Sequence, residues 1–321
     1  MAIFTGRSKV LGGTEKETQK EQFFYGLVQQ HVLVTGADGQ LGSALRALTG
    51  MMNLPFRFFF TDAGELDITD PSQVEAYVRE QQVRYILNCA AYTAVDKAER
   101  NREKAYAVNA TGVENIALVA KQYGIRLIHI STDFVFDGTS TVPYKEESEA
   151  RPLSVYGETK LKGEQLLQAV GGEWIILRTS WLYSEYGSNF VKRMLQLMQE
   201  REQLTVVDDQ RGSPTYAVDL AEMMIHILQD TEENGWKSGI YHFSNRGETS
   251  WFGFAEAIRR MAGIDSCKVI PITTEEYPTA ARRPAYSVMD LSKICNTFRV
   301  EIPGWEEALQ RCIKKIQLAE S

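Results

Sequence analysis

The stretch that decides the fold is VLVTGADGQLG, which covers Val32 to Gly42. Its apolar half predicts a β-strand, and the amphipathic residues that follow predict a helix. Gly36, Gly39 and Gly42 stand in the turn between them at G-x-x-G-x-x-G spacing. Such glycines permit a tight turn, a close backbone approach to a pyrophosphate, and packing of the helix on the strand. We predict a dinucleotide-binding loop with phosphates at the helix N-terminus. The alternative is a turn that needs glycine but binds no ligand.

Downstream of this loop, short apolar runs alternate with amphipathic helical patterns. Predicted strands cover residues 31–36, 56–62, 84–91, 126–132 and 174–180, and predicted helices cover 39–48, 71–82, 102–123 and 156–170. Strands that are apolar almost throughout are typical of a parallel sheet with helices on both faces. We therefore predict an α/β fold: a Rossmann-type doubly wound parallel sheet with a smaller, mostly helical α/β substrate domain.

After about residue 179 the alternation loosens, which indicates a second domain. We predict a polar N-terminal extension over residues 1–30 and a dinucleotide-binding domain over 31–178. Late elements from about 204–240 are expected to return to that domain. The substrate domain would comprise residues 179–203 and 241–321, with mostly helical structure after residue 249.

Composition excludes several classes of protein. A net charge of −7 and a pI near 5.4 argue against a general nucleic-acid surface. The four cysteines and four histidines are scattered without metal-ligand spacing, so we expect no metal site and no disulfide framework. No apolar run reaches the length of about 18 residues that spans a bilayer. These features together predict a cytoplasmic protein with no membrane partner.

Two carboxylates after the second predicted strand bear on the choice of cofactor. Asp62, at the strand's end, would accept hydrogen bonds from ribose hydroxyls and repel a 2′-phosphate. It lies somewhat beyond the usual ~20 residues from the loop, so a simple turn residue is an equal alternative. Asp67 is expected near the adenine. Because no arginine follows the strand directly, we predict NADPH or NADH as cofactor without deciding between them.

A possible reaction centre is formed by Thr132, Tyr156 and Lys160. Thr132 ends the fourth predicted strand, and the other two lie one helical turn apart on one face of a helix. Composition alone gives roughly 0.65 Tyr-x-x-x-Lys matches by chance, so the pair has meaning only in this context. A ketone that receives a hydride needs a proton on its oxygen. We predict Tyr156 as the acid, Lys160 as the ammonium that lowers its pKa, and Thr132 as the group that positions the carbonyl.

These motifs together resemble the extended short-chain dehydrogenase/reductase superfamily. The glycine loop, N-C-A-A at 88–91, V-N-A-T-G at 108–112, S-T-D at 131–133 and Y-x-x-x-K at 156–160 follow in the order of that family. The resemblance implies that Asn109 supports the active-site helix and also lies among the cofactor contacts. The cofactor contacts it implies are Gly36, Gly39, Gln40, Leu41, Gly42, Asp62, Asp67, Ile68, Ala90, Ala91, Tyr92, Asn109, Tyr156 and Lys160.

Within the superfamily the chain is similar to the dTDP-4-dehydrorhamnose reductases. Matching blocks are AAYTAVDKAE (90–99), STDFVFDG (131–138), YGETKLKGE (156–164), RTSWLY (178–183), GSNF (187–190), DDQRGSPT (208–215) and YPTAARRP (277–284). This similarity implies reduction of the 4-keto group of dTDP-4-dehydro-6-deoxy-L-mannose to dTDP-L-rhamnose. The substrate contacts it implies are Thr93, Val95, Thr132, Asp133, Trp181, Asn189, Arg282 and Arg283. For Trp181 plain core packing is an alternative, and for the two arginines a solvated surface pair.

Two departures from the family pattern affect these expectations. Some members bind magnesium at a dimer interface through glutamates, but Ala44 stands where one of these glutamates would be. We therefore expect any homodimer not to be bridged by metal. Phe134 stands where many members have tyrosine, which removes one polar contact to substrate.

Three rival functions remain open. A nucleotide-sugar dehydratase would need a glutamate after Thr132 and Asp133, where this chain has Phe134. An epimerase of the same superfamily fits the later sequence blocks less well. The third rival is a non-catalytic subunit resembling the regulatory subunit of methionine adenosyltransferase, in whose relatives the VDKAE and RTSW blocks are blurred; here both blocks are intact.

Overall fold

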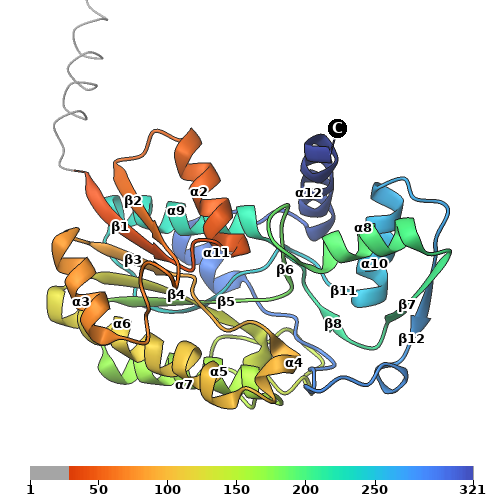
Figure 1. The fold of residues 1–321 in the computed structure, drawn as a ribbon, viewed down its shortest axis with the longest axis horizontal. Helices are drawn as coiled ribbons and strands as arrows, with labels where there is room; N and C mark the ends of the chain where they lie inside the picture. Colours follow the sequence, from red (N-terminus) through yellow and green to blue (C-terminus); the bar gives the residue numbers. More distant parts are fainter. Residues whose placement is uncertain (1–28, 321) are drawn as a thin grey trace, which may run out of the picture.

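The core of the molecule is a parallel sheet of six strands in the order β10-β5-β4-β3-β1-β2 (Figure 1). The computed structural model describes residues 29–320, so the predicted extension over residues 1–30 lies almost wholly outside the described residues. The strands are β1 (Gln30–Thr35), β2 (Phe56–Thr61), β3 (Tyr85–Asn88), β4 (Arg126–Thr132), β5 (Trp174–Thr179) and β10 (Gly239–His242). All pair in parallel, as predicted.

Helices cover both faces of this sheet because successive side chains of each strand point to opposite faces. On β1, Val32 and Val34 pack under α2 (Gln40–Met51) and α9 (Ala217–Asn234). Leu33 packs on the other side with α3 (Pro71–Glu80), α6 (Gly112–Tyr123) and α7 (Val155–Val170). Figure 1 shows the two helical layers above and below the strands. The predicted doubly wound α/β fold is confirmed.

The strand order reverses at β1, which lies between β2 and β3. Open α/β sheets bind ligands outside the carboxyl ends of their strands at such a point. The glycine loop follows β1 here, and Gly36 adopts a left-handed φ of 65°. A Cβ at Gly36 would lie 2.6 Å from the Cα of Ala90, so only glycine fits.

The predicted helix over residues 102–123 is interrupted. It consists of α5 (Arg102–Tyr106), a π-helical segment η1 (Ala107–Thr111) and α6. The π-helical segment lies against α7, where a Cβ at Gly163 would come 2.1 Å from the carbonyl oxygen of Asn109. This close contact positions the helix that carries Tyr156.

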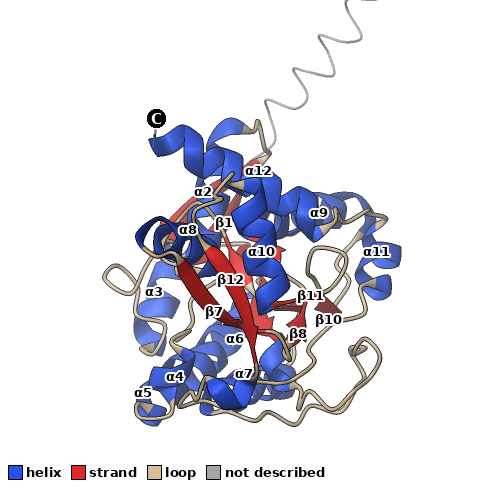
Figure 2. Ribbon diagram, turned by 90° about the vertical axis from the view of Figure 1, so that its right-hand side faces the viewer, coloured by secondary structure: helices blue, strands red, loops and turns tan. Residues whose placement is uncertain are grey.

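A second lobe lies at the right of Figure 1 and faces the viewer in Figure 2. It contains α8 (Phe190–Glu200), α10 (Trp251–Met261) and three small sheets. These sheets pair β7 (Gln203–Val207) with β12 (Lys268–Ile272), β8 (Arg211–Gly212) with β11 (Thr249–Ser250), and β6 (Leu182–Tyr183) with β9 (Thr215–Tyr216). The remaining elements are α4 (Val95–Ala98), η2 (Asp133–Val135), η3 (Thr274–Glu276), α11 (Ser292–Phe298) and α12 (Trp305–Glu320).

Two strands have partners other than those expected from the predicted division into domains. β7 was expected to return to the central sheet but pairs with β12, a strand that the sequence does not predict. β10 pairs with β5 and completes the central sheet, although its second half falls in the predicted substrate segment. The domain boundaries themselves stay a prediction.

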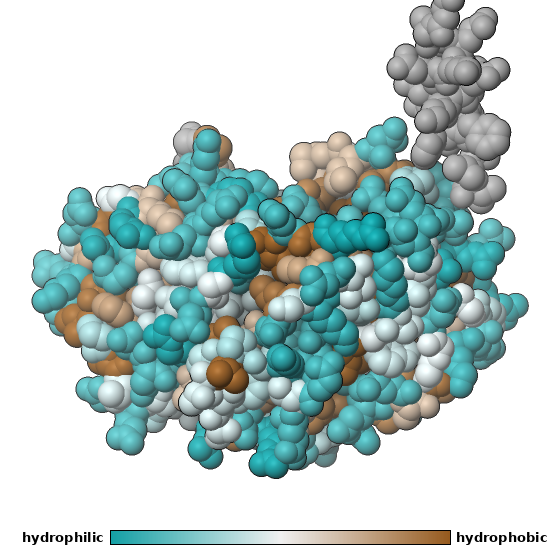
Figure 3. All heavy atoms as spheres, turned by 180° about the vertical axis from the view of Figure 1, so that it is seen from behind, coloured by the Kyte–Doolittle hydropathy of each residue, from teal (hydrophilic) through white to brown (hydrophobic). Residues whose placement is uncertain are grey.

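Hydrophilic residues cover most of the face seen in Figure 3, and apolar residues show there as smaller groups. Within residues 29–320, the helices are too short or too polar to cross a membrane.

Candidate active site

A cavity of about 870 Å³ opens at the carboxyl ends of the central strands, between the sheet and the second lobe. The glycine loop, the ends of β3 and β4, and the start of α7 form one wall. Residues after β5 and at the start of α10 form the other. The predicted site residues that line it are Gly36, Gly39, Gln40, Leu41, Gly42, Asp62, Asp67, Ile68, Ala90, Ala91, Tyr92, Thr93, Val95, Thr132, Asp133, Tyr156, Lys160, Trp181, Asn189 and Arg283.

The glycine loop meets the requirements for holding a diphosphate. Gly39 is the N-cap of α2 and offers no side chain to satisfy the first N–H groups of the helix. Free N–H groups at a helix N-terminus attract phosphate oxygens. Gln40 extends from the loop to the second lobe, where its amide donates to the carbonyl of Leu182 (3.3 Å) and accepts from Asn189 (2.9 Å). The loop is therefore tied to both walls of the cavity.

The two predicted cofactor carboxylates also hold the turns in which they lie. Asp62 accepts hydrogen bonds from the backbone N–H groups of Asp38 (3.0 Å) and Ala63 (2.7 Å). Asp67 accepts from the backbone N–H and the hydroxyl of Thr69, at 2.9 and 2.8 Å. Both still line the cavity, with Asp38 beside them. Asp62 and Asp67 can therefore hold their turns and still contact a ligand in the cavity.

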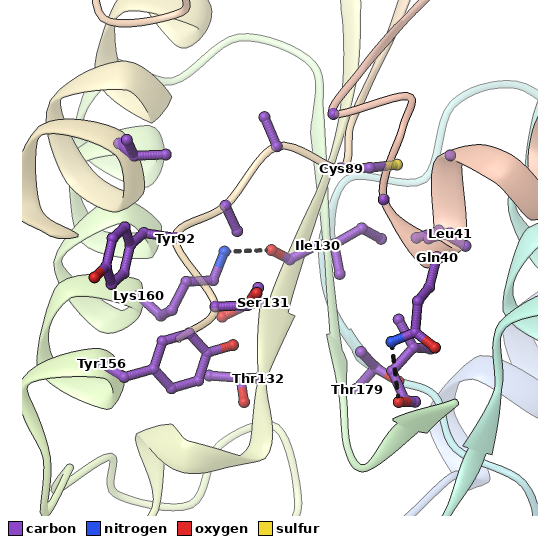
Figure 4. Close-up of a pocket in the computed structure, with 18 of the residues that line it drawn as sticks. Gln40, Leu41, Cys89, Tyr92, Ile130, Ser131, Thr132, Tyr156, Lys160 and Thr179 are labelled. Carbon is purple, nitrogen blue, oxygen red and sulfur yellow. Dashed lines mark hydrogen bonds between the residues drawn. The ribbon is translucent and has the colours of Figure 1, made fainter. Parts of the chain in front are cut away.

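Thr132, Tyr156 and Lys160 come together at the end of β4 (Figure 4). The α7 helix begins after Ser154, whose hydroxyl accepts from the N–H of Gly157 (3.2 Å). Both side chains of the Tyr–Lys pair point from α7 toward β4. The hydroxyl of Tyr156 points toward the side chain of Thr132 in Figure 4. The helix therefore brings a phenol and an ammonium to one hydroxyl at the strand's end.

The charges at this point differ from the prediction. Burial raises the pKa of Tyr156 to about 12, opposed by the Thr132 hydrogen bond and assisted by the negative charge of Asp133. The ammonium of Lys160 turns toward the sheet and donates to the carbonyl of Ile130 at 2.6 Å. Burial lowers the pKa of Lys160 to about 8, although the charge of Glu164 opposes this change. The expected lowering of the tyrosine pKa by Lys160 is therefore absent in this arrangement, and Tyr156 carries its proton at neutral pH.

Asp133 is the third polar group beside Thr132. Its Oδ1 accepts the Thr132 hydroxyl at 3.0 Å. Burial raises the pKa of Asp133 to about 6, while hydrogen bonds from Ser287 and Thr132 lower it. Its Oδ2 is buried and has no hydrogen-bond partner in the described part of the chain. Asp133 also lines the cavity, which places its side chain beside a ligand bound there.

Two predicted site residues do not line the cavity. Asn109 lies beneath it, where its amide donates to the carbonyl of Tyr92 and to the hydroxyl of Thr159, each at 3.1 Å. This contact matches the expected support of the active-site helix. Arg282 is exposed, whereas the adjacent Arg283 lines the cavity and pairs with Asp96 at 2.6 Å.

The second-lobe wall is aromatic. Trp181 lies on Trp251 with ring centroids 3.6 Å apart and an angle of 9° between the rings. Trp181 has a φ of 46°, a conformation that costs a bulky residue energy and that packing must hold. Thr93 and Val95, which are also predicted to contact substrate, line the opposite side of the cavity, after β3. Both rings line the cavity, so this wall offers apolar aromatic surface of the kind that suits a sugar.

Several lining residues have no signal in the sequence. Trp251 begins α10 and lines the cavity beside Trp181, on which it stacks. Lys104 on α5 also lines the cavity and belongs to none of the matching blocks. Ser180 lines it too; it lies within the RTSWLY block but was not predicted as a site residue. Among residues 29–320, no group of three or more histidine, cysteine or acidic side chains could hold a metal ion.

Comparison with known proteins agrees with this site. Residues 30–318 match the family model described as RmlD substrate binding domain. The chain is 42% identical to the dTDP-4-dehydrorhamnose reductase of Aggregatibacter actinomycetemcomitans, over 87% of this chain and 97% of that one. It is 37% identical to the dTDP-4-keto-6-deoxy-D-glucose reductase of Streptomyces niveus, over 90% and 98%.

Among solved structures, the dTDP-4-dehydrorhamnose reductase of Bacillus anthracis in complex with NADP superimposes with a TM-score of 0.84. It is 40% identical, and the match covers 90% of this chain and all of that one. The predicted resemblance is confirmed. The chain belongs to the dTDP-4-dehydrorhamnose reductase family.

Proposed function

We propose that the protein reduces the 4-keto group of dTDP-4-dehydro-6-deoxy-L-mannose to dTDP-L-rhamnose, with NADPH or NADH as the reductant. The observation that carries this proposal is the single cavity in which the glycine loop, Thr132, Tyr156 and Lys160 face the Trp181 ring and Arg283. The wall that carries the glycine loop and the three polar side chains suits a dinucleotide and the transfer of a proton. The other suits a deoxysugar and its diphosphate.

The residues of the first wall fit the cofactor. The uncapped start of α2 would hold the pyrophosphate, and Asp62 and Asp67 would hold the adenosine. Lys160 would hold the nicotinamide ribose. When bound, the reduced nicotinamide supplies the hydride that forms the new C–H bond at C4.

Tyr156 would supply the proton. Because its pKa is raised to about 12, the phenol is protonated at neutral pH and can donate to the oxygen of the reduced carbonyl. Thr132 would hold that oxygen once its hydroxyl proton turns to it from Oδ1 of Asp133. Asp133, which lines the cavity, would accept from a sugar hydroxyl. The product oxygen gains this proton, and the Tyr156 phenolate later regains one from solvent.

Arg283 would bind the diphosphate. Its guanidinium donates to both carboxylate oxygens of Asp96, at 3.1 and 2.6 Å, which holds it at the edge of the cavity. A guanidinium fixed by one carboxylate retains donors for phosphate oxygens.

We further propose a homodimer without a metal bridge and a cytoplasmic location. In support, Ala44, which replaces a metal-ligating glutamate of some relatives, is completely buried in α2. Light scattering with and without a chelator tests the assembly: a dimer that a chelator dissociates would contradict it.

The experiment that tests the function is turnover of the keto sugar, made in place from dTDP-glucose by the upstream dehydratase and epimerase. Consumption of NADPH or NADH with formation of dTDP-L-rhamnose is the expected result, and dTDP-glucose alone is the control that should give none. Formation of a different deoxysugar would transfer the proposal to another substrate, such as that named for the Streptomyces niveus relative. No oxidation of either cofactor would contradict it.

A further inference from the structure

A buried chain of polar side chains leads from the end of β1 to Lys160. The Thr35 hydroxyl lies 2.7 Å from Oδ1 of Asn88, whose Nδ2 lies 3.0 Å from Nδ1 of His129. On its other side, Nε2 of His129 lies 3.4 Å from Nζ of Lys160. All four side chains are at most 2% exposed. Burying so many polar groups is costly unless each finds a partner. We therefore examine how the donors and acceptors of these four side chains match.

The protonation state of His129 follows from its surroundings. Burial and the positive charge of Lys160 lower the pKa of His129 well below its ordinary value, so the ring is neutral at pH 7. A neutral ring carries one proton, on Nδ1 or on Nε2. Because a lysine ammonium can only donate, Nε2 must accept from it. The proton of His129 therefore lies on Nδ1, facing Asn88.

Asn88 must then present its oxygen to His129. An amide turned by 180° keeps its shape, and its two ends exchange places. With Oδ1 toward His129 and Nδ2 toward Thr35, the Nδ1 proton of His129 meets an acceptor and the Thr35 oxygen accepts from Nδ2, while the Thr35 hydroxyl proton gives up Asn88 as its acceptor. In the opposite orientation, with Nδ2 toward His129, Nε2 carries the proton and points at Nζ of Lys160. This arrangement is favourable only when Lys160 is an uncharged amine.

The other groups around Lys160 explain why Nε2 of His129 is important as an acceptor. The ionisable groups that affect it are Glu164 on its own helix and the thiol of Cys89 after β3. Glu164 is already paired with Arg178 of β5 at 2.7 Å. The ammonium donates to the carbonyl of Ile130, and a second donor fixed by His129 leaves its third N–H for the cavity.

We propose that His129 is a positioning residue for Lys160, which fixes the direction of the ammonium through Nε2, while Asn88 and Thr35 hold the ring in the tautomer that accepts. The consequence for turnover rests on the proposed function, but the arrangement itself does not.

The direct test is nitrogen NMR of the full chain with labelled histidine. The chain has four histidines, so loss of one set of signals in His129→Gln identifies the ring. We expect a protonated Nδ1, an unprotonated Nε2 and no titration near the ordinary pKa of about 6.5. A proton on Nε2, or titration near that pH, would overturn the proposal even in a preparation with no reductase activity.

A matched pair of variants tests the effect on turnover. The longer Gln side chain of His129→Gln can place an oxygen where Nε2 lies, whereas His129→Asn reaches only the position of Nδ1. We expect His129→Gln to stay within about threefold of wild-type kcat, and His129→Asn to lose about tenfold. In His129→Asn the alkaline limb of kcat/KM should also move to lower pH, because the charged form of Lys160 loses an acceptor. If both variants fold, lose activity equally and keep the wild-type pH profile, the role is structural and the proposal is wrong.

Discussion

The two walls of the cavity hold their side chains in different ways. The sheet wall, formed by Thr132, Tyr156 and Lys160, uses one strand and the helix packed against it. Thr132 and Lys160 are buried and hydrogen-bonded within the protein, and Tyr156 is partly buried beside them. The lobe wall, formed by Trp181, Trp251 and Arg283, draws on three distant segments. It is held by the ring contacts of Trp181 and Trp251 with each other and with Phe190 and Phe254, and by one partly exposed ion pair.

This difference suggests a division of labour. A buried group with fixed hydrogen bonds keeps the geometry that proton transfer needs. A ring stack and a partly exposed ion pair offer contact area and charge to a ligand, which the substrate and the transition state use alike. Changes in the sheet wall should therefore act on kcat, and changes in the lobe wall on KM.

The largest expected effect follows Tyr156→Phe. The ring still fits the buried site, but the proton donor is lost, so we expect kcat to fall by ~10²–10⁴-fold with KM little changed. Tyr92→Phe is the matched control. Tyr92 also lines the cavity, but its hydroxyl accepts from Asn101 at 3.3 Å and points away from Tyr156 in Figure 4. An equal loss in both variants would remove the special role of Tyr156.

Arg283→Ala should have the next largest effect. Removal of a charged donor from the diphosphate site is expected to raise KM for the nucleotide sugar about tenfold to a hundredfold. The neighbouring Arg282→Ala is the control and should stay within about twofold, since its side chain is exposed and outside the cavity. Steady-state kinetics of the two variants decides the matter; an unchanged KM in Arg283→Ala would refute the role of this wall.

A smaller effect is expected from Trp181→Ala. Loss of the ring should raise KM about threefold to tenfold, the range of one aromatic contact. Trp181→Phe keeps an aromatic ring against Trp251 and should recover most of the loss. If KM of both variants equals that of the wild type, the Trp181 ring only packs the lobe, as the alternative from the sequence holds.

A separate prediction concerns stability rather than catalysis. Burial raises the pKa of Asp133 from 3.8 to about 6, so the folded state favours the protonated carboxyl. Its burial should therefore cost stability progressively as the pH rises from about 4 to 6, by about 3 kcal/mol at most. Asp133→Asn cannot ionise, and we expect its melting temperature to exceed that of the wild type at pH 7 but not at pH 4. A lower melting temperature at pH 7 would contradict the assigned burial cost.

The sheet wall was predictable from the sequence, because its residues lie within motifs whose geometry is local. The glycine loop follows its strand directly, and one helical turn separates Tyr156 from Lys160. The direction of the ammonium was not predictable. It depends on Ile130 and His129, which have no motif and contact Lys160 only in the folded chain.

Most of the lobe wall required the structure. Arg282 and Arg283 are adjacent in sequence, yet only Arg283 faces the cavity, because Asp96, far away in the chain, holds it there. Trp251 is recognised as part of this wall only in the structure, where it stacks on Trp181. The strand β12 was missed because its five residues include Pro271, which sequence patterns count against a strand.

The most direct test of this division is the single-turnover rate of Arg283→Ala at saturating nucleotide sugar and cofactor. If the lobe wall binds and the sheet wall reacts, this rate should lie within a few-fold of the wild-type rate while Tyr156→Phe stays slower by orders of magnitude. A single-turnover rate for Arg283→Ala as low as that of Tyr156→Phe would show that the two walls do not divide the work.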